Sequence, residues 1–150
     1  MNFSFDKICD LPDEILLTIL KNLSNIHVLY SLFGVNQRLN TIVRDFSFTS
    51  HLTLFERSTD LDGFKSNRGI NSLSDVVIDR FCSQVLPAIC QRIKWLDVEP
   101  TCIKRIFYAT KYANLTGLGI YGVDIGDVVS LLTSKFNFQL NNIFFLNLQI

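Results

Sequence analysis

The side chains best suited to nucleophilic or metal chemistry are four cysteines and two histidines. They are Cys9, Cys82, Cys90, Cys102, His27 and His51. No Cys-x-x-Cys pair occurs, and neither histidine has a carboxylate at a ligand spacing. Cys82 and Cys90 lie two turns apart on one predicted helix face, about 12 Å, which is too far for a disulfide. We therefore expect reduced, mostly buried cysteines, structural or surface histidines, and no metal or cofactor.

Sequence motifs of the common enzyme classes are missing as well. The chain has no Gly-x-Ser-x-Gly, no glycine-rich phosphate loop and no His-Glu-x-x-His. Asp124 and Asp127 resemble a metal pair, but capping of the helix that follows explains both more simply. A cysteine–histidine hydrolase would need one of the four cysteines to meet a histidine from the first 51 residues. We expect a protein that is not an enzyme.

Composition narrows the classes of partner. The 150 residues suffice for one domain or two small modules, and 48% of them are hydrophobic, so a buried core is achievable. Lys and Arg number 14 and Asp and Glu also number 14, which gives no basic field for a nucleic acid or an anionic membrane surface. The acidic N-terminal sequence is neither a signal nor a transit peptide, and no apolar run is long enough to span a bilayer. We expect a cytoplasmic or nuclear address.

Three short helices are predicted between residues 11 and 46. The first begins at Leu11-Pro12, where proline suits the first helical position and Asp13 and Glu14 favour the positive end of the helix dipole. Ile15, Ile19 and Leu23 follow at four-residue steps, while Leu16, Leu17 and Leu20 widen the apolar arc well beyond one stripe. A helix this apolar needs covering on two sides, by its own domain and by a partner. The second helix ends at Gly34, and Asn36 opens the third.

The run LPDEILLTILKNLSNIHVLYSLFGVNQRLNTIV resembles an F-box, the three-helix motif that attaches substrate receptors to the small adaptor of cullin-RING ubiquitin ligases. Leu-Pro-x-Glu-Ile, the Ile-Leu three residues on, Leu23 and Val-x-x-Arg at Val35 to Arg38 follow the order of that motif. The resemblance implies a set of residues that contact the ligase adaptor. They are Leu11, Pro12, Ile15, Ile19, Leu20, Leu32 and Val35.

Residues 56–72 are rich in charge and glycine and carry little hydrophobic pattern, so we expect a linker there. It would divide a helical module, residues 1–55, from a second module, residues 73–150. The second module opens with a helix from about Ser74, which Pro87 bends or ends.

Beyond that helix, an L-x-x-L-x-L frame occurs three times. Its positions are Ile93, Leu96 and Val98; Leu115, Leu118 and Ile120; and Ile143, Leu146 and Leu148. Helical segments from Pro100 and Asp124 separate the frames, as in a leucine-rich-repeat solenoid. The predicted fold is α+β to α/β: a three-helix F-box followed by a short, truncated β/α solenoid, with more repeats expected after Ile150.

Residues that alternate with the buried leucines should line the concave face of this sheet. They are Trp95, Asp97, Glu99, Gly117, Gly119, Tyr121, Phe145, Asn147 and Gln149. Trp95, Asp97, Tyr121 and Phe145 are the candidate target-binding residues, with the aromatics as anchors because large aromatics dominate interface energies. For Trp95 and Phe145 the alternative is a position in the core or under a loop.

The predicted function is a substrate-recognition adaptor of an SCF-type (cullin-RING) ubiquitin ligase. Its partners are the ligase adaptor and an unknown protein substrate, with no nucleic acid and no membrane. The alternative is a leucine-rich interaction scaffold, unconnected to ubiquitin ligase, whose first helices cap the solenoid.

Overall fold

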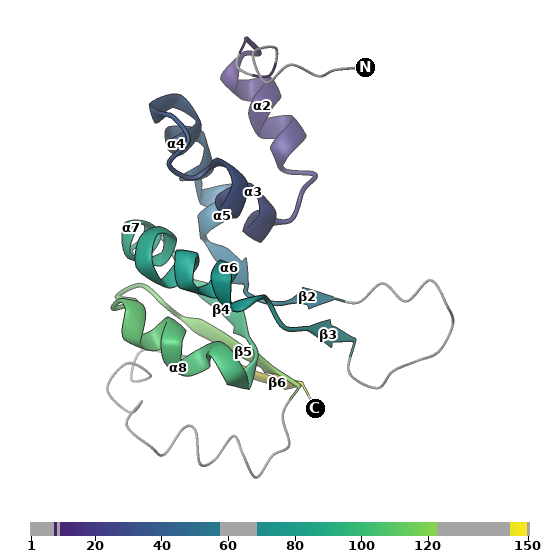
Figure 1. Ribbon diagram of the computed structural model, residues 1–150, viewed down its shortest axis with the longest axis vertical. Coiled ribbons are helices and arrows are strands. Elements are labelled where there is room, and N and C mark those ends of the chain that lie inside the picture. Colours follow the sequence, from purple (N-terminus) through teal and green to yellow (C-terminus); the bar gives the residue numbers. More distant parts are fainter. Residues whose placement is uncertain (1–7, 9, 58–68, 123–144, 150) are drawn as a thin grey trace.

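The computed structural model describes residues 8, 10–57, 69–122 and 145–149, the last range by its backbone alone. Its N-terminal part is helical, with α2 (Asp13–Leu20), α3 (Asn25–Leu32), α4 (Gln37–Val43) and the short α5 (Phe46–Thr49) (Figure 1). Helix α2 starts one residue later than predicted, because Pro12 is its N-cap. The predicted opening of the third helix at Asn36 is confirmed, since Asn36 is the N-cap of α4 and its side chain accepts a hydrogen bond from the Leu39 amide at 2.8 Å.

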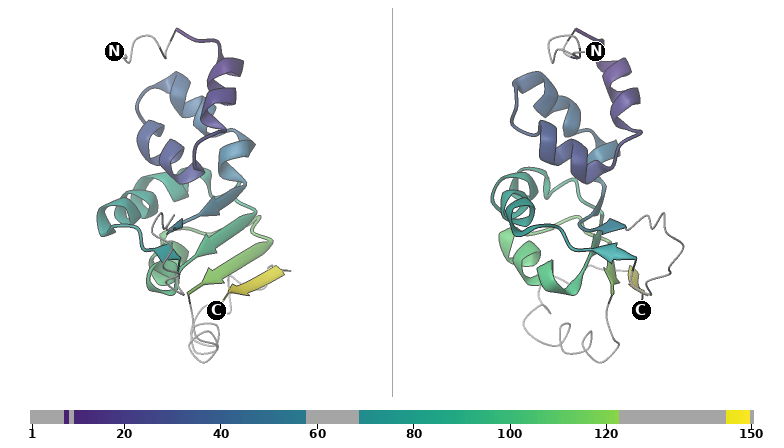
Figure 2. Two further views of the ribbon diagram at one scale, coloured as in Figure 1. Left: turned by 90° about the vertical axis from the view of Figure 1, so that its right-hand side faces the viewer. Right: turned by 45° about the vertical axis from the view of Figure 1, so that its right-hand side comes forward.

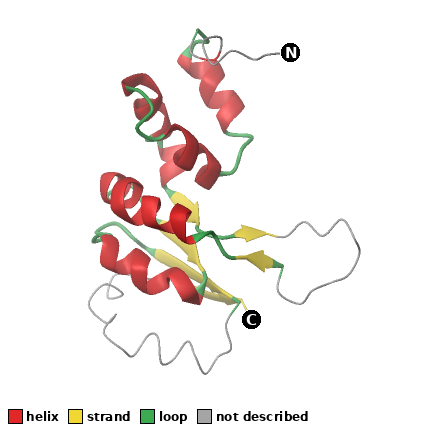
Figure 3. Ribbon diagram, viewed as in Figure 1, coloured by secondary structure: helices red, strands yellow, loops and turns green. Residues whose placement is uncertain are grey.

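The second part is a parallel sheet covered by helices on one face. Its strands are β1 (His51–Thr53), β4 (Trp95–Val98), β5 (Gly117–Tyr121) and β6 (Phe145–Gln149), in the order β1-β4-β5-β6. The covering helices are α6 (Asp75–Arg80), the π-helical η1 (Phe81–Val85), α7 (Leu86–Ile89) and α8 (Pro100–Ala109). Figure 2 shows these helices on one side of the strands, and Figure 3 shows the helical N-terminal part beyond the β1 edge.

The strand register agrees with the three leucine frames. Leu96 lies opposite Leu118, which in turn lies opposite Leu146. Leu96 and Leu118 are both fully buried against the helices. The predicted helix from Asp124 lies outside the described residues. The π-helical turn η1 precedes Pro87, whose missing amide proton and ring disturb regular helical hydrogen bonding.

Strand β1 departs from the predicted division of the chain. The sequence pattern assigned His51 to the helical module, but His51 pairs with Trp95 in the sheet. The Ser50 carbonyl accepts the amides of Lys94 and Trp95 at 2.9 and 3.0 Å. A strand of three residues carries too little alternation to be recognised.

The segment predicted as a linker contains paired strands. Glu56–Arg57 (β2) and Ile70–Asn71 (β3) pair in antiparallel fashion, and residues 58–68 between them lie outside the described part. One hydrophobic core runs from α2 through the helices to β5. Arg80 on α6 also donates to the Phe33 carbonyl at 3.1 Å and lies over the Tyr30 ring. The two parts are therefore not independent modules.

The cysteines described are free. Cys90 and Cys102 are buried and Cys82 is half-buried, while Cys9 lies outside the described residues. Burial raises the pKa of Cys102 to about 11, so this thiol is protonated at neutral pH. In the part of the chain that the structure describes, no three or more His, Cys, Asp or Glu side chains group in a way that could hold a metal ion. Among the same residues, no helix has the length and apolarity to cross a membrane.

Candidate functional site

The helical part leaves one face of α2 uncovered. Ile15 and Ile19, one helical turn apart, are each 48% exposed, and Leu23 just beyond the helix is 53% exposed. On the opposite side of the same helix, Leu16 and Leu20 are buried. The chain therefore covers only one of the two apolar sides predicted for this helix. The other side is exposed apolar surface of the kind that marks a binding site.

Most of the predicted adaptor contacts are accessible. Pro12, Ile15, Ile19 and Val35 are exposed, and Leu11 and Leu32 are half-buried. Leu20 is the exception. It is 8% exposed and packs in the core, because it lies on the inner side of α2, one residue round from Ile19. The structure adds two exposed apolar residues that were not predicted as contacts, Leu23 and Ile8.

An apolar cavity of about 230 Å³ lies between α2, α3 and α4. Its lining consists of Ile8, Leu16, Leu20, Leu23, His27, Val28, Ser31, Leu32 and Leu39. Because Ile8 and Leu23 are also exposed, the cavity reaches the surface beside the uncovered face of α2. Leu20 and Leu32 line this cavity. A partner would therefore contact these two residues only by inserting a side chain of its own into the cavity.

Arg38 connects the start of α2 to α4. Its guanidinium pairs with the Asp13 carboxylate at 2.7 Å and also donates to the Leu11 carbonyl. These two contacts tie the start of α2, where Leu11 and Pro12 lie, to α4. Sequence reasoning identified Arg38 as part of the motif without assigning it this contact.

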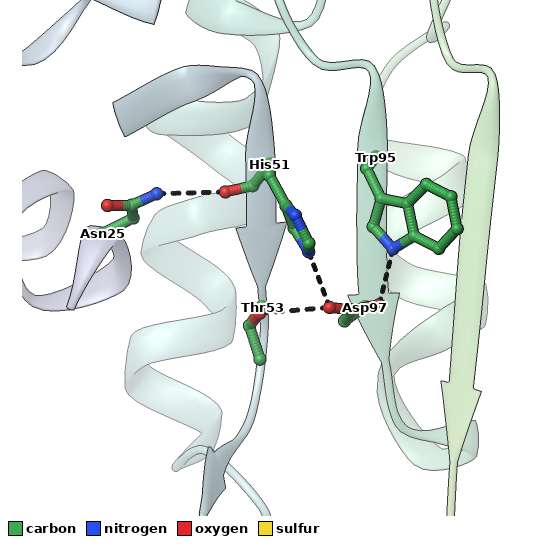
Figure 4. Close-up of polar contacts among 5 residues, drawn as sticks. All are labelled: Asn25, His51, Thr53, Trp95 and Asp97. Carbon is green, nitrogen blue, oxygen red and sulfur yellow. Dashed lines mark hydrogen bonds and ion pairs between the residues drawn. The ribbon is translucent and has the colours of Figure 1, made fainter. Parts of the chain in front are cut away.

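The sheet face opposite the helices carries a buried carboxylate at its centre (Figure 4). Asp97 accepts hydrogen bonds from Trp95 Nε1 at 2.7 Å and from Thr53 at 3.3 Å, and its other close partner is His51 Nε2 at 2.7 Å. Burial raises the pKa of the Asp97 carboxyl, but the hydrogen bonds from His51, Trp95 and Thr53 outweigh that effect. The net result is a pKa below the ordinary value.

Two glycines on β5 make room for this arrangement. The Trp95 indole lies across Gly117 and the Asp97 carboxylate lies against Gly119, in space that a Cβ atom would occupy. Tyr121 also contacts Gly119, and its ring packs on Phe55 with centroids 4.9 Å apart. The Gly-x-Gly sequence of β5 could have indicated this arrangement, because a glycine within a strand often marks a place where another group packs closely against the backbone.

These contacts correct part of the predicted target-binding set. Asp97 and Tyr121 were expected to be exposed, yet they are 4% and 7% exposed. Both lie against Gly119; His51, Thr53 and Trp95 bond to the Asp97 carboxylate, and the Tyr121 ring packs on Phe55. Trp95 is half-buried. Phe145 lies opposite Gly117 in the register, and its side chain is outside the described part. The alternation itself holds, since Leu96 points into the core.

Both histidines meet a carboxylate that sequence spacing did not reveal. His51 meets Asp97, which is 46 residues away, and His27 lies 3.3 Å from Glu56. The partners come from different elements, so no local spacing indicates them.

A comparison with protein families finds an F-box domain at residues 8–51. This range includes all of α2 to α5 and ends at the first residue of β1. An F-box domain indicates, in general, an adaptor role in an SCF-type ubiquitin ligase, and such domains typically bind the small adaptor of cullin-RING complexes. No family match confirms a leucine-rich-repeat region, and no solenoid is detected. A search of curated proteins finds no match.

Proposed function

We propose that this chain is a non-catalytic substrate receptor of an SCF-type ubiquitin ligase, acting in the cytoplasm or nucleus. In this proposal the uncovered face of α2 binds the ligase adaptor, and the open face of the sheet binds the protein to be modified. The observation that carries it is that, within an F-box domain, Ile15 and Ile19 are exposed on one side of α2 and Leu23 is exposed just beyond the end of that helix. Exposed apolar surface of this kind is stabilised when a partner covers it.

The sheet region supports the second half of the proposal by its layout. Helices occupy one face of the strands, and the other carries Trp95 and His51 with part of their surface exposed. Parallel β/α units in series also agree with a leucine-rich-repeat-like region that extends the F-box.

The test is co-elution of the full chain with a purified cullin-RING adaptor in size-exclusion chromatography. We expect a complex with the wild-type chain and none with the double variant Ile15→Asp and Ile19→Asp, because a carboxylate on each residue would be desolvated at the interface. Val76→Asp is the matched control, since Val76 is an exposed apolar residue on α6, at 69%.

Equal loss of binding by the control variant, or a wild-type chain that never forms the complex, would contradict the proposal. The second result would favour the alternative, a leucine-rich scaffold without a role in ubiquitin ligation. That alternative draws on the continuous core that joins the first helices to the sheet.

A further inference from the structure

Three side chains on the sheet face opposite the helices bond to one buried carboxylate, that of Asp97 (Figure 4). In the strand register, His51 pairs with Trp95 and Thr53 pairs with Asp97. Because alternate residues of a strand point to the same side, all four lie on the face opposite Leu96. The His51 side chain is 56% exposed, and Thr53 and Trp95 are half-buried. His51, Thr53 and Trp95 therefore form one accessible surface over Asp97.

The hydrogen-bond donors of this surface point inward. Burial raises the pKa of the Asp97 carboxyl, but its hydrogen bonds lower that pKa further, to below the ordinary value. The group is an ionised carboxylate at neutral pH, so it accepts hydrogen bonds and donates none. His51 Nε2 and Trp95 Nε1, both at 2.7 Å, and the Thr53 hydroxyl at 3.3 Å therefore donate their hydrogens to Asp97.

The outward side of the same three residues offers acceptors. A neutral imidazole that donates from Nε2 has a lone pair on Nδ1, and the Thr53 hydroxyl oxygen keeps its lone pairs. One face of the Trp95 indole lies across Gly117, and the other face, seen in Figure 4, is the electron-rich side that attracts cations. We call His51, Thr53 and Trp95 the acceptor surface.

The charge beneath the acceptor surface favours the same kind of ligand. Asp97 pairs with His51, and no ion pair among the described residues joins it to a lysine or an arginine. With His51 neutral, the carboxylate leaves a negative charge that salt screens less than an exposed one. An anionic group would meet like charge and no donor from these side chains, whereas a cation would meet acceptors and opposite charge.

We propose that the acceptor surface binds a cationic side chain of the target protein, the guanidinium of an arginine or the ammonium of a lysine. The cation lies on the outer face of the Trp95 indole beside the His51 ring, whose centre is 5.9 Å from that of the indole. Asp97 holds both rings in place beforehand, so little conformational freedom is lost on binding. The inference rests on the proposed function, in which this face of the sheet binds the target, and names the kind of residue recognised.

The experiment titrates the full chain with three end-capped peptides that differ at one position. They are Ser-Leu-Arg-Leu-Ser, the same sequence with citrulline in place of arginine, and Ser-Leu-Glu-Leu-Ser. Citrulline keeps the length and the planar end group of arginine but carries no charge. Trp95 is the only tryptophan in the sequence, so its fluorescence and the NMR signal of its indole N–H report on the acceptor surface directly.

The arginine peptide is expected to bind most tightly. In mildly alkaline buffer, which favours a neutral imidazole, we expect its affinity to exceed that of either other peptide by at least about tenfold. The difference should shrink as salt is added, because part of it is charge attraction. Equal binding of the three peptides, or no response of Trp95 to any of them, would overturn the inference.

Three variants that each introduce one lysine locate the site. Thr53→Lys and His51→Lys place a cation on the acceptor surface, so each should weaken the arginine peptide by about tenfold or more. Val76→Lys is the matched control and should leave the affinity unchanged, because Val76 is exposed on α6, which covers the opposite face of the sheet. Circular dichroism checks that each variant folds. If Thr53→Lys unfolds, His51→Lys decides, and an equal effect of the control would overturn the inference.

The outcome is separable from the test of the proposed function. Thr53 lies outside the F-box domain at residues 8–51, so Thr53→Lys should still co-elute with the ligase adaptor. Adaptor binding without a preference for the arginine peptide would reject the cation inference alone. A preference for that peptide without adaptor binding would reject the ligase role and leave a module that binds basic segments.

Discussion

Helix α2 and strands β4 and β5 all carry regularly spaced aliphatic residues, but part of the aliphatic surface of α2 stays exposed whereas Leu96 and Leu118 on the strands are buried. On the strands, Leu96 and Leu118 are fully buried, because a covering helical layer lies over the face they occupy. On α2, Ile15 and Ile19 remain half-exposed, since the helix packs against the rest of the chain on one side alone. Aliphatic spacing shows which residues share a face, and the neighbouring elements decide whether that face is core or interface.

The largest expected effect is at the covered face. Leu96→Ala should lower the free energy of unfolding by about 2–5 kcal/mol, since it removes buried methyl groups and leaves a cavity between sheet and helices. Urea denaturation followed by circular dichroism measures it. Val76→Ala on the exposed side of α6 is the control and should change stability by no more than about 0.5 kcal/mol. Similar losses in the two variants would contradict the assignment of Leu96 to the core.

On the face of β4 opposite Leu96, a substitution is expected to lower the free energy of unfolding by a smaller amount. Asp97→Ala should cost about 1–3 kcal/mol, because it leaves Trp95 and Thr53 without their acceptor in a half-buried setting. A loss no larger than that of Val76→Ala would show that the hydrogen bonds around Asp97 contribute nothing net.

Asp97 also gives a pH dependence with a defined sign. Its pKa in the folded chain lies below the ordinary value of 3.8, so on acidification the unfolded chain takes up this proton first. The contribution to stability is complete above the ordinary pKa and is lost as pH falls through the folded pKa. The difference in unfolding free energy between wild type and Asp97→Ala should therefore shrink as pH is lowered below about 4. Constancy of that difference down to pH 2 would contradict the pKa shift.

A smaller loss of stability is expected at the N-cap of α4, and the N-cap of α3 provides the comparison. Asn36→Ala should cost about 1 kcal/mol, since its side chain caps α4 through the Leu39 amide. Ser24 at the start of α3 makes no such bond, so Ser24→Ala is the matched control and should cost clearly less. Equal costs in thermal or urea unfolding would show that the cap on α4 contributes nothing specific.

The features predicted correctly from the sequence are those that depend on local or periodic signals. The frames around Leu96 and Leu118 gave the register of β4 on β5, and Asn36 gave a helix start. The features that were missed depend on residues far apart in the chain. His51 meets Asp97 across 46 residues through a strand too short to show alternation.

The candidate site divides in the same way. Ile15, Ile19 and Leu20 were all predicted to contact the ligase adaptor; Ile15 and Ile19 are exposed, whereas Leu20 is buried. Because α2 is apolar on most of its sides, the sequence does not indicate which side packs against the rest of the chain and which side stays exposed. On the sheet, the side chains of Asp97 and Tyr121 lie against Gly119, which leaves space for both. This burial depends on cross-strand pairing, which the alternation within one strand does not reveal.

The smallest expected effect on stability is also the one that defines an interface. Ile19→Ala should change the free energy of unfolding by no more than about 0.5 kcal/mol, because the side chain is already 48% exposed and few of its contacts are lost. Its affinity for the ligase adaptor should nevertheless fall by about tenfold, since full burial of an isoleucine side chain is worth about 1.5–3 kcal/mol and truncation to alanine removes most of it. Leu16→Ala on the inner side of α2 should show the reverse order, with a large loss of stability at 1% exposure. Unfolding curves and adaptor titrations on the two variants decide between interface and core, and an Ile19→Ala chain as destabilised as Leu16→Ala would place this face of α2 in the core.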